Sequence, residues 1–218
     1  MTVPIDERPL AGVRVVDLTN VLAGPYCSYQ LTLLGAEVVK VEIPGTGDLA
    51  RRLGADEALN KELLGASFLA QNAGKKSVTL DLKTDEGVAR FRELVAGADV
   101  LLENFRPGVL ARLGFSWDEL RAVNERLVYC AISGFGQSGP MRERPAYDQI
   151  IQGLSGMMSV TGTPETAPLR AGFPVCDTLG GLAAALSIAA ALAGRVRTGR
   201  GCRVDVSLLE TAIWRWAG

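Results

Sequence analysis

An aspartate at the start of a long alanine-rich segment is the side chain best placed for chemistry. Asp177 follows the apolar residues 173–176, and Gly180 and Gly181 come within the next turn. One common role for such an aspartate is to cap its helix. The other is chemical, because an ionised carboxylate at the positive end of a helix can act as a nucleophile. The glycines favour the second role, since each weakens a helix by up to ~1 kcal/mol and lets a ligand approach the backbone closely.

The composition excludes several other kinds of chemistry. The 218 residues contain no histidine, which excludes Ser-His-Asp and Cys-His catalysis and imidazole metal ligands within this chain. The four cysteines lie far apart, without Cys-x-x-Cys spacing, so we expect each to be reduced in a core and predict no metal site. The formal net charge of −1 provides no overall field that would attract nucleic acid or an anionic membrane.

Neither the first residues nor the most apolar segment predicts export or membrane insertion. Residues 1–12 lack the apolar core of a signal peptide. Residues 179–194 are nearly half alanine and form a short segment for a bilayer span. We therefore expect a soluble, cytoplasmic protein that contacts no membrane.

Alternating apolar runs and helical segments predict an α/β fold with a parallel sheet. Residues 13–18 and 36–42 are expected to be strands on either side of a helix over 26–34, which makes a βαβ unit. No GxGxxG sequence occurs at its turn, so the dinucleotide-binding fingerprint is missing. Further strands are expected over 77–82, 99–102, 127–133 and 203–206. Further helices are expected over 61–71, 84–95, 109–113, 116–123, 147–158, from Asp177 to about Arg195, and from Ser207 onward.

Five ordered motifs resemble those of one enzyme family. They are VVDLTNVLAGPYCSYQLTLLGAEVVKVEIPGTGD, KSVTLDLKTDEG, DVLLENFRPG, AYDQIIQ, and the aspartate before an alanine-rich helix that leads to TGRG. In this order and spacing they are similar to the class III CoA-transferases, the CaiB/BaiF family. That family includes formyl-CoA transferase and is related to alpha-methylacyl-CoA racemase. The resemblance covers nearly all of the chain and is far more specific for the family than for the substrate.

The resemblance also implies an architecture. Family members have a large CoA-binding domain, with a Rossmann-like parallel sheet flanked by helices, and a smaller second domain. By this comparison, residues 1–218 form most of the large domain, and the second domain is absent from this chain. Residues 208–218 would begin a connecting helix, and we expect Trp214 and Trp216 to pack on something outside the chain. Full-length relatives resemble interlocked rings, so the resemblance implies a homodimer.

The resemblance gives Asp177 the role of nucleophile, with an acyl-CoA and a small carboxylic acid as substrates and no permanently bound cofactor. The carboxylate attacks the acyl-CoA thioester, giving an aspartyl–acyl anhydride and CoA thiolate. The thiolate attacks the aspartyl carbonyl to give an aspartyl-CoA thioester, and an acceptor carboxylate reverses the sequence. No proton has to move, so no histidine is required. We expect the helix terminus to keep Asp177 ionised and the backbone at Gly180 and Gly181 to hold developing oxyanions.

Positions that contact CoA in the family carry over to several loops of this chain. Lys83, Arg106 and Arg112 would suit the CoA phosphates, whereas residue type alone favours solvated surface cations. Asp17 and Asp99 are expected to be structural acids at strand ends. The positions carried over are Leu22, Ala23, Leu80, Asp81, Leu82, Lys83, Asn104, Phe105, Arg106, Arg112, Tyr147 and Asp148.

Two other functions stay open from the sequence. Racemases of the family have a histidine where Tyr147 stands, and a tyrosine with a reference pKa near ~10 does not easily replace it. This favours CoA transfer over racemisation. The second alternative is a truncated CoA-binding domain without catalysis. Some transferases carry glutamine at Leu22, arginine at Ile43 and glutamate at Asp148, so the sequence identifies neither the acyl donor nor the acceptor.

Overall fold

Six parallel strands form the sheet in the computed structural model, which describes residues 4–214. The spatial order is β3-β2-β1-β4-β5-β6, with parallel pairing between all neighbours. This is a doubly wound order that reverses direction between β1 and β4. The Rossmann-like parallel sheet is therefore confirmed. The strands are β1 (Arg14–Asp17), β2 (Glu37–Glu42), β3 (Lys76–Thr79), β4 (Val100–Glu103), β5 (Val128–Ser133) and β6 (Arg203–Ser207).

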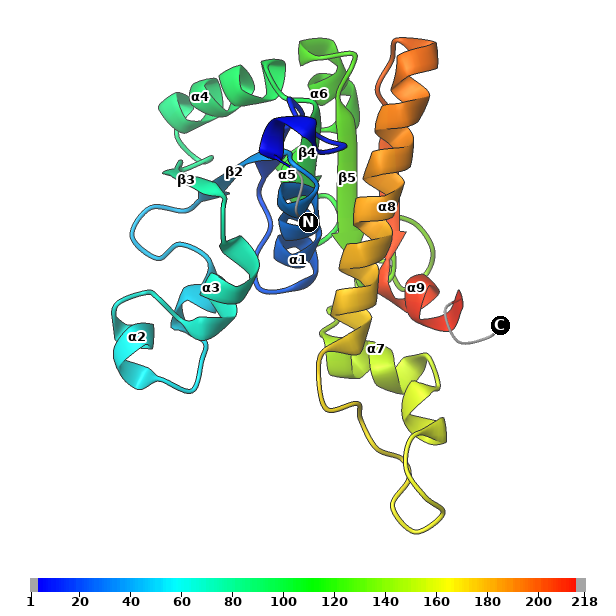
Figure 1. The fold of residues 1–218 in the computed structure, drawn as a ribbon. Helices are drawn as coiled ribbons and strands as arrows, with labels where there is room; N and C mark the ends of the chain where they lie inside the picture. Colours follow the sequence, from blue (N-terminus) through cyan, green and yellow to red (C-terminus); the bar gives the residue numbers. More distant parts are fainter. Residues whose placement is uncertain (1–3, 215–218) are drawn as a thin grey trace.

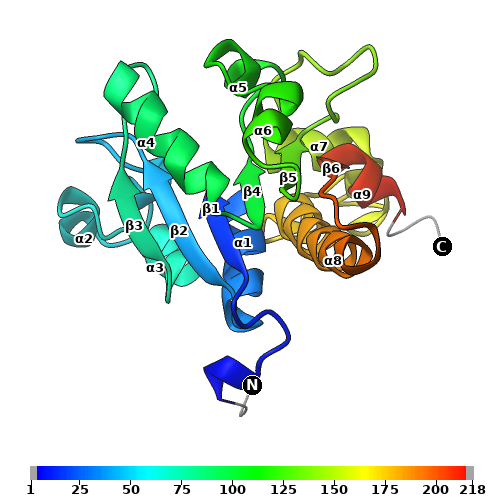
Figure 2. The same cartoon turned by 90° about the horizontal axis from the view of Figure 1, so that it is seen from above.

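Apolar side chains alternate between two cores, one on each face of the sheet. Val15, Val100 and Leu102 belong to one core, and Val16 and Leu101 belong to the other. Figure 2 shows α1 (Ala23–Leu33) and α8 (Val175–Thr198) on one face, with α4 (Asp85–Ala96) and α6 (Trp117–Val123) on the other. Because helices cover both faces, the central strands can be apolar at successive positions, as a parallel sheet requires.

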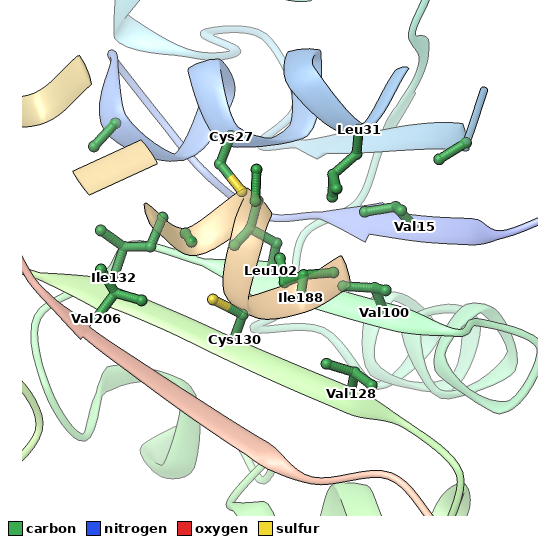
Figure 3. Close-up of a cluster of buried hydrophobic side chains, with 14 of the residues drawn as sticks. Val15, Cys27, Leu31, Val100, Leu102, Val128, Cys130, Ile132, Ile188 and Val206 are labelled. Atoms are coloured by element: carbon green, nitrogen blue, oxygen red, sulfur yellow. The ribbon is translucent and has the colours of Figure 1, made fainter. Parts of the chain in front are cut away.

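The core on the face covered by α1 and α8 includes side chains from α8, a long apolar helix. Figure 3 shows Cys27 and Leu31 from α1 and Ile188 from α8 among side chains of the central strands. Among the described residues, α8 is long and apolar enough to cross a membrane by length and composition. It nevertheless packs against α1, β5 and β6, so we interpret it as a core helix.

The helix starts that the sequence predicts most sharply are confirmed. Thr84 accepts the N–H of Gly87 at the start of α4, and Ser116 and Glu119 form a reciprocal capping box at α6. Two predicted helices are wrong in extent. Residues 61–71 are divided between two helices, and the helix after Tyr147 ends before Gly156, which adopts a left-handed φ of 84°. The remaining elements are η1 (Ile5–Glu7), η2 (Leu49–Arg52), α2 (Glu57–Lys61), α3 (Ala66–Asn72), α5 (Val109–Arg112), α7 (Asp148–Leu154), η3 (Met157–Val160) and α9 (Leu208–Trp214).

Two segments extend the fold beyond the sheet and its covering helices. Figure 1 shows the chain after α7, in yellow, reaching away from the sheet before it returns to α8. α9 packs back on the core through Leu208 and Ala212. The expected packing of Trp214 and Trp216 lies outside the part of the chain whose side chains are described.

The structure corrects one cysteine and confirms both structural acids. Cys202 is exposed just before the edge strand β6, whereas the other three cysteines are buried free thiols. Asp17 accepts the hydroxyls of Thr19 and Ser28. Burial alone would raise the pKa of Asp17, but Lys40, Lys75 and the hydrogen bonds from Ser28 and Thr19 together lower it. Asp99 accepts a hydrogen bond from Arg195 at 2.8 Å.

Candidate functional site

Three adjoining cavities lie at the carboxyl ends of the strands, around the point where the strand order reverses. The first, second and third cavities have volumes of about 270, 210 and 160 Å³. Phe105 lines all three, Asn20 lines the first two, and Asn104 lines the second and third. Ligands of open α/β sheets bind outside the carboxyl ends of strands at such a reversal. We call the three cavities together the ligand site.

Asp177 lines the second cavity and does not cap its own helix. It is the third residue of α8, whose N-cap is Pro174. Among the described residues, none donates a hydrogen bond to its carboxylate. Leu22, Ala23 and Tyr147 line the same cavity. The capping role is therefore wrong, and the carboxylate is left available to a ligand.

Asp148 takes the capping role from a different helix. Its Oδ1 accepts the N–H of Cys176 at 2.7 Å and that of Asp177 at 3.1 Å. Its Oδ2 accepts the side-chain amide of Gln152, whose own oxygen accepts the N–H of Ala171 at 2.7 Å. Asp148 is buried and lines none of the three cavities. The structure thus places it behind Asp177, where it satisfies free N–H groups of the first turn of α8.

Burial of Asp177 outweighs the favourable end of its helix. Loss of water around the carboxylate, followed by repulsion from Asp148, raises the pKa of Asp177 to about 7. The expectation that the helix terminus keeps Asp177 ionised does not agree with this raised pKa. Two of the N–H groups that could stabilise its charge are already bonded to Asp148. The titration of this carboxyl is therefore moved from the acid range toward neutral pH.

Gly180 and Gly181 serve helix packing, which corrects their expected role at a ligand. A Cβ on Gly180 would lie 2.2 Å from Leu208 Cδ2, and one on Gly181 would lie 2.4 Å from the carbonyl oxygen of Ala23. Both residues follow the first turn of α8, where backbone N–H groups bond within the helix. They therefore do not form the expected oxyanion site. They let α9 and the start of α1 approach the helix that carries Asp177.

Gly181→Ala is expected to destabilise the fold by about 1–3 kcal/mol, the usual cost of forcing a methyl group into a packed contact. The added Cβ would meet backbone, which cannot move aside as a flexible side chain can. Gly194→Ala, in the same helix with nothing within 4 Å of its added Cβ, is the matched control and should be neutral or stabilising. Urea unfolding of both variants measures the difference. Equal stabilities would contradict the packing role.

The structure brings most of the predicted contact residues together at the ligand site. Tyr147, which is 69% exposed, lines the second and third cavities. Arg112 lies apart from them, exposed on α5 beside Gly108. The others are Leu80, Asp81, Leu82 and Lys83 in the first cavity, Leu22 and Ala23 in the second, Asn104 in the second and third, Phe105 in all three, and Arg106 in the third.

Two arginines at the ligand site were missed by the sequence reasoning. Arg142 and Arg144 line the third cavity with Arg106. Three guanidinium groups at one cavity suit a phosphate or a carboxylate. The available signal was a local cluster of basic residues just before the AYDQIIQ motif. Other residues that line the second cavity and were absent from the prediction include Asn20, Val21, Ile132, Ser133, Gly134 and Leu208.

Hydrogen bonds join the loop after β1 to the loop after β4, and join the end of β4 to β5. Asn104 Oδ1 accepts the Asn20 N–H at 2.9 Å, and its Nδ2 donates to the Asn20 carbonyl at 2.8 Å. Glu103 accepts the Phe105 N–H at 2.6 Å and the Tyr129 hydroxyl at 2.8 Å. Burial raises the pKa of Glu103 to about 7. These contacts set the position of Phe105, which all three cavities share.

The fold and site together define a doubly wound α/β domain that presents a carboxylate and several guanidinium groups at the reversal of its strand order. The profile of the CoA-transferase family III matches residues 10–218. The chain therefore belongs to CoA-transferase family III.

Individual relatives agree with this assignment. The chain is 44% identical over 210 residues to a succinate–glutarate CoA-transferase of Agrobacterium fabrum, covering 95% of this chain and 52% of the relative. It is 47% identical over 208 residues to an acetyl-CoA:oxalate CoA-transferase of Acetobacter aceti, with 95% and 52% covered. A crystal structure of a CaiB/BaiF family protein from Brucella suis superposes with a TM-score of 0.89 at 41% identity, covering 95% of this chain and 55% of that one. The chain thus spans about half the length of these relatives.

Proposed function

We propose that this chain carries the CoA-binding site and the nucleophile of an acyl-CoA:carboxylate CoA-transferase. The observation that supports this most directly concerns Asp177. Its carboxylate does not cap its own helix, and it lines a cavity at the strand-order reversal. The named relatives transfer CoA among succinate, glutarate, acetyl and oxalate groups. The substrates proposed here are accordingly an acyl-CoA and a small carboxylic acid, with no permanently bound cofactor.

The proposed reaction starts with ionised Asp177. One carboxylate oxygen attacks the thioester carbonyl, the C–S bond breaks, and CoA leaves as a thiolate. The thiolate then attacks the aspartyl carbonyl of the anhydride, which releases the donor acid and leaves CoA joined to Asp177 as a thioester. The acceptor carboxylate displaces CoA to form a second anhydride. CoA thiolate attacks its acceptor carbonyl, giving the new acyl-CoA and free Asp177.

Trapping of the covalent intermediates tests this proposal. The chain is incubated with succinyl-CoA and then treated with hydroxylamine or borohydride, and peptides are examined by mass spectrometry. Hydroxylamine converts an aspartyl anhydride or thioester to a hydroxamate on Asp177. A folded sample that binds CoA but carries no modification at Asp177 would contradict the proposal and favour the non-catalytic CoA-binding alternative.

The rate of acylation is expected to rise with pH through about 7. The neutral carboxyl is a poor nucleophile, and the pKa of Asp177 is raised to about 7. We expect about a tenth of the limiting rate at pH 6 and a plateau above pH 8. Single-turnover release of CoA thiol between pH 5.5 and 8.5 measures this step alone. A flat profile over that range would mean that ligand binding keeps Asp177 ionised throughout.

CoA is proposed to lie across the first and third cavities, with its thioester in the second. Lys83 in the first cavity is expected to contact a phosphate, and Lys83→Ala should weaken CoA binding about fivefold, as for one partly exposed charged contact. Lys76→Ala is the matched control, because Lys76 is also exposed but pairs with Glu37. Calorimetric titration with CoA compares the two variants. Equal affinities for CoA would show that Lys83 does not contact CoA.

Architecture and alternatives complete the proposal. Residues 1–218 are proposed to form most of a large CoA-binding domain of a cytoplasmic homodimer, with residues 208–218 beginning a connection to a second domain. Racemisation is the alternative enzyme activity. It would require a base at the position of Tyr147, which is exposed and lines the second cavity. Deuterium incorporation at the α-carbon of a 2-methylacyl-CoA would favour racemisation over transfer.

A further inference from the structure

The loop between β1 and α1 holds a valine in a backbone conformation that valine rarely adopts. Val21 has a φ of +70°, in the left-handed region that favours glycine. Its branched side chain makes this conformation especially unfavourable. Strain of this kind persists only where surrounding contacts enforce it, and it is concentrated at functional sites. Val21 itself lines the second cavity, as Asp177 does.

Four successive backbone groups of this loop are bound by side chains from distant parts of the chain. Lys40 Nζ donates to the carbonyl of Thr19 at 2.5 Å. Asn104 binds both the N–H and the carbonyl of Asn20. Asp48 Oδ1 accepts the N–H of Val21 at 2.9 Å. These contacts fix the residues before and at the strained position, so they hold the left-handed conformation in place.

Lys40 and Asp48 form a buried ion pair beneath the loop. Lys40 Nζ lies 2.9 Å from Asp48 Oδ2, and the two side chains are 1% and 0% exposed. Burying two charges gives little stability compared with an apolar pair of similar size. What the pair does supply is a donor for the Thr19 carbonyl and an acceptor for the N–H groups of Val21 and of Ala50 at the start of η2. Its geometric role is therefore better supported than a role in overall stability.

The loop that the pair holds connects directly to the helix that carries Asp177. Leu22 and Ala23 line the second cavity beside Val21. The carbonyl of Ala23 lies against Gly181, only 2.4 Å from where a Cβ would stand. A change in the backbone at Val21 would therefore move one wall of the cavity and alter the packing one turn after Asp177.

We propose that Lys40 and Asp48 are positioning residues for acyl transfer, because they hold Val21 in its left-handed conformation and so set the cavity wall formed by residues 21–23. The proposal rests on CoA transfer at Asp177 and adds two residues that line no part of the second cavity. Neither touches the reacting atoms, and both act through the backbone of the β1–α1 loop.

Asp48→Ala tests the proposal with two separate readouts. Amide hydrogen exchange at Val21 should become about tenfold faster or more, because its N–H loses its acceptor. Single-turnover acylation of Asp177 should slow about 10- to 100-fold, as expected for a misplaced reacting group, with a smaller change in CoA affinity. The exchange readout needs no substrate and so does not depend on the proposed reaction.

A second substitution separates positioning from a general loss of structure. Glycine adopts the left-handed region without strain, so Asp48→Ala/Val21→Gly should recover part of the lost acylation rate. Leu63→Gly is the matched control, because Leu63 also has a positive φ of 61° but lines none of the three cavities. Adding it to Asp48→Ala should recover none of the rate.

Lys40→Met/Asp48→Leu keeps the test decisive if Asp48→Ala fails to fold. This double variant removes both charges of the pair and leaves buried Asp17 paired with Lys75, so it should fold while leaving the Val21 N–H without its acceptor. We expect fast exchange at Val21 and slow acylation. Unchanged exchange, or an acylation rate equal to that of the parent, overturns the positioning role. If the parent itself never acylates Asp177 while amide exchange at Val21 is faster in the variants, the CoA-transfer proposal fails. The claim that Asp48 fixes the backbone of Val21 is then still supported.

Discussion

Asp177→Asn is expected to lower the rate of acyl transfer about 10⁴-fold or more, as for removal of a covalent nucleophile. The amide has almost the shape of the carboxylate but cannot form the anhydride. Asp177 is the one acid among the described residues that line the second cavity, so no neighbouring carboxylate there can replace it. Single-turnover release of CoA thiol, with CoA binding measured in parallel, checks this result. A variant that binds CoA and still turns over would exclude Asp177 as the nucleophile.

The same variant carries its own test of folding. The pKa of Asp177 is raised from 3.8 to about 7 in the folded chain, so the folded state holds this proton more tightly than the unfolded state. Ionising Asp177 therefore costs stability. The cost is absent below pH ~4, grows between pH 4 and 7, and is complete above pH 7. Asparagine has no such cost, so Asp177→Asn should melt at a higher temperature than the parent at pH 8 and at a similar temperature at pH 4. Lower stability at pH 8 would show that the loss of activity came from misfolding.

The sheet could be predicted because its evidence is local. Apolar runs such as residues 13–18 and 127–133, separated by helical segments, are enough to indicate parallel strands covered on both faces. Helix starts were equally accessible where a capping pair lies within one turn, as at Ser116 and Glu119. The residues of the ligand site in the loops after β1 and β4 came from the family resemblance, and the strand order of the structure explains why these two loops meet.

The errors concern contacts between segments far apart in the sequence. Gly180 and Gly181 suggested room for a ligand, but what fills the space beside them is Leu208 and the carbonyl of Ala23. The helix of Asp177 suggested a low pKa, but its first N–H groups belong to Asp148, 29 residues away along the chain. A local pattern shows that a glycine or a free N–H exists, and only the tertiary structure shows what occupies it.

Asp148→Ala is expected to slow acylation about 100-fold, because it releases the turn of helix that carries Asp177. The N–H groups of Cys176 and Asp177 lose their acceptor, and the side-chain amide of Gln152 keeps only a 3.5 Å bond to the Phe173 carbonyl. Each buried group left without a partner costs about 1–3 kcal/mol. We therefore expect a clear loss of stability in urea unfolding together with the slower reaction.

Asp148→Asn is the matched variant that separates the hydrogen bonds from the charge. Its amide oxygen can still accept the N–H groups of Cys176 and Asp177, and only the bond from the Gln152 amide is lost, because an NH2 group takes the place of Oδ2. The acylation rate at high pH should therefore stay within about tenfold of the parent. Removing the negative charge relieves one of the two causes that raise the pKa of Asp177. The midpoint of the pH–rate profile should then move to lower pH, whereas burial of Asp177 shifts its pKa upward. Equal losses in the alanine and asparagine variants would show that Asp148 acts through its charge, and an unmoved midpoint would show that the charge does not reach Asp177.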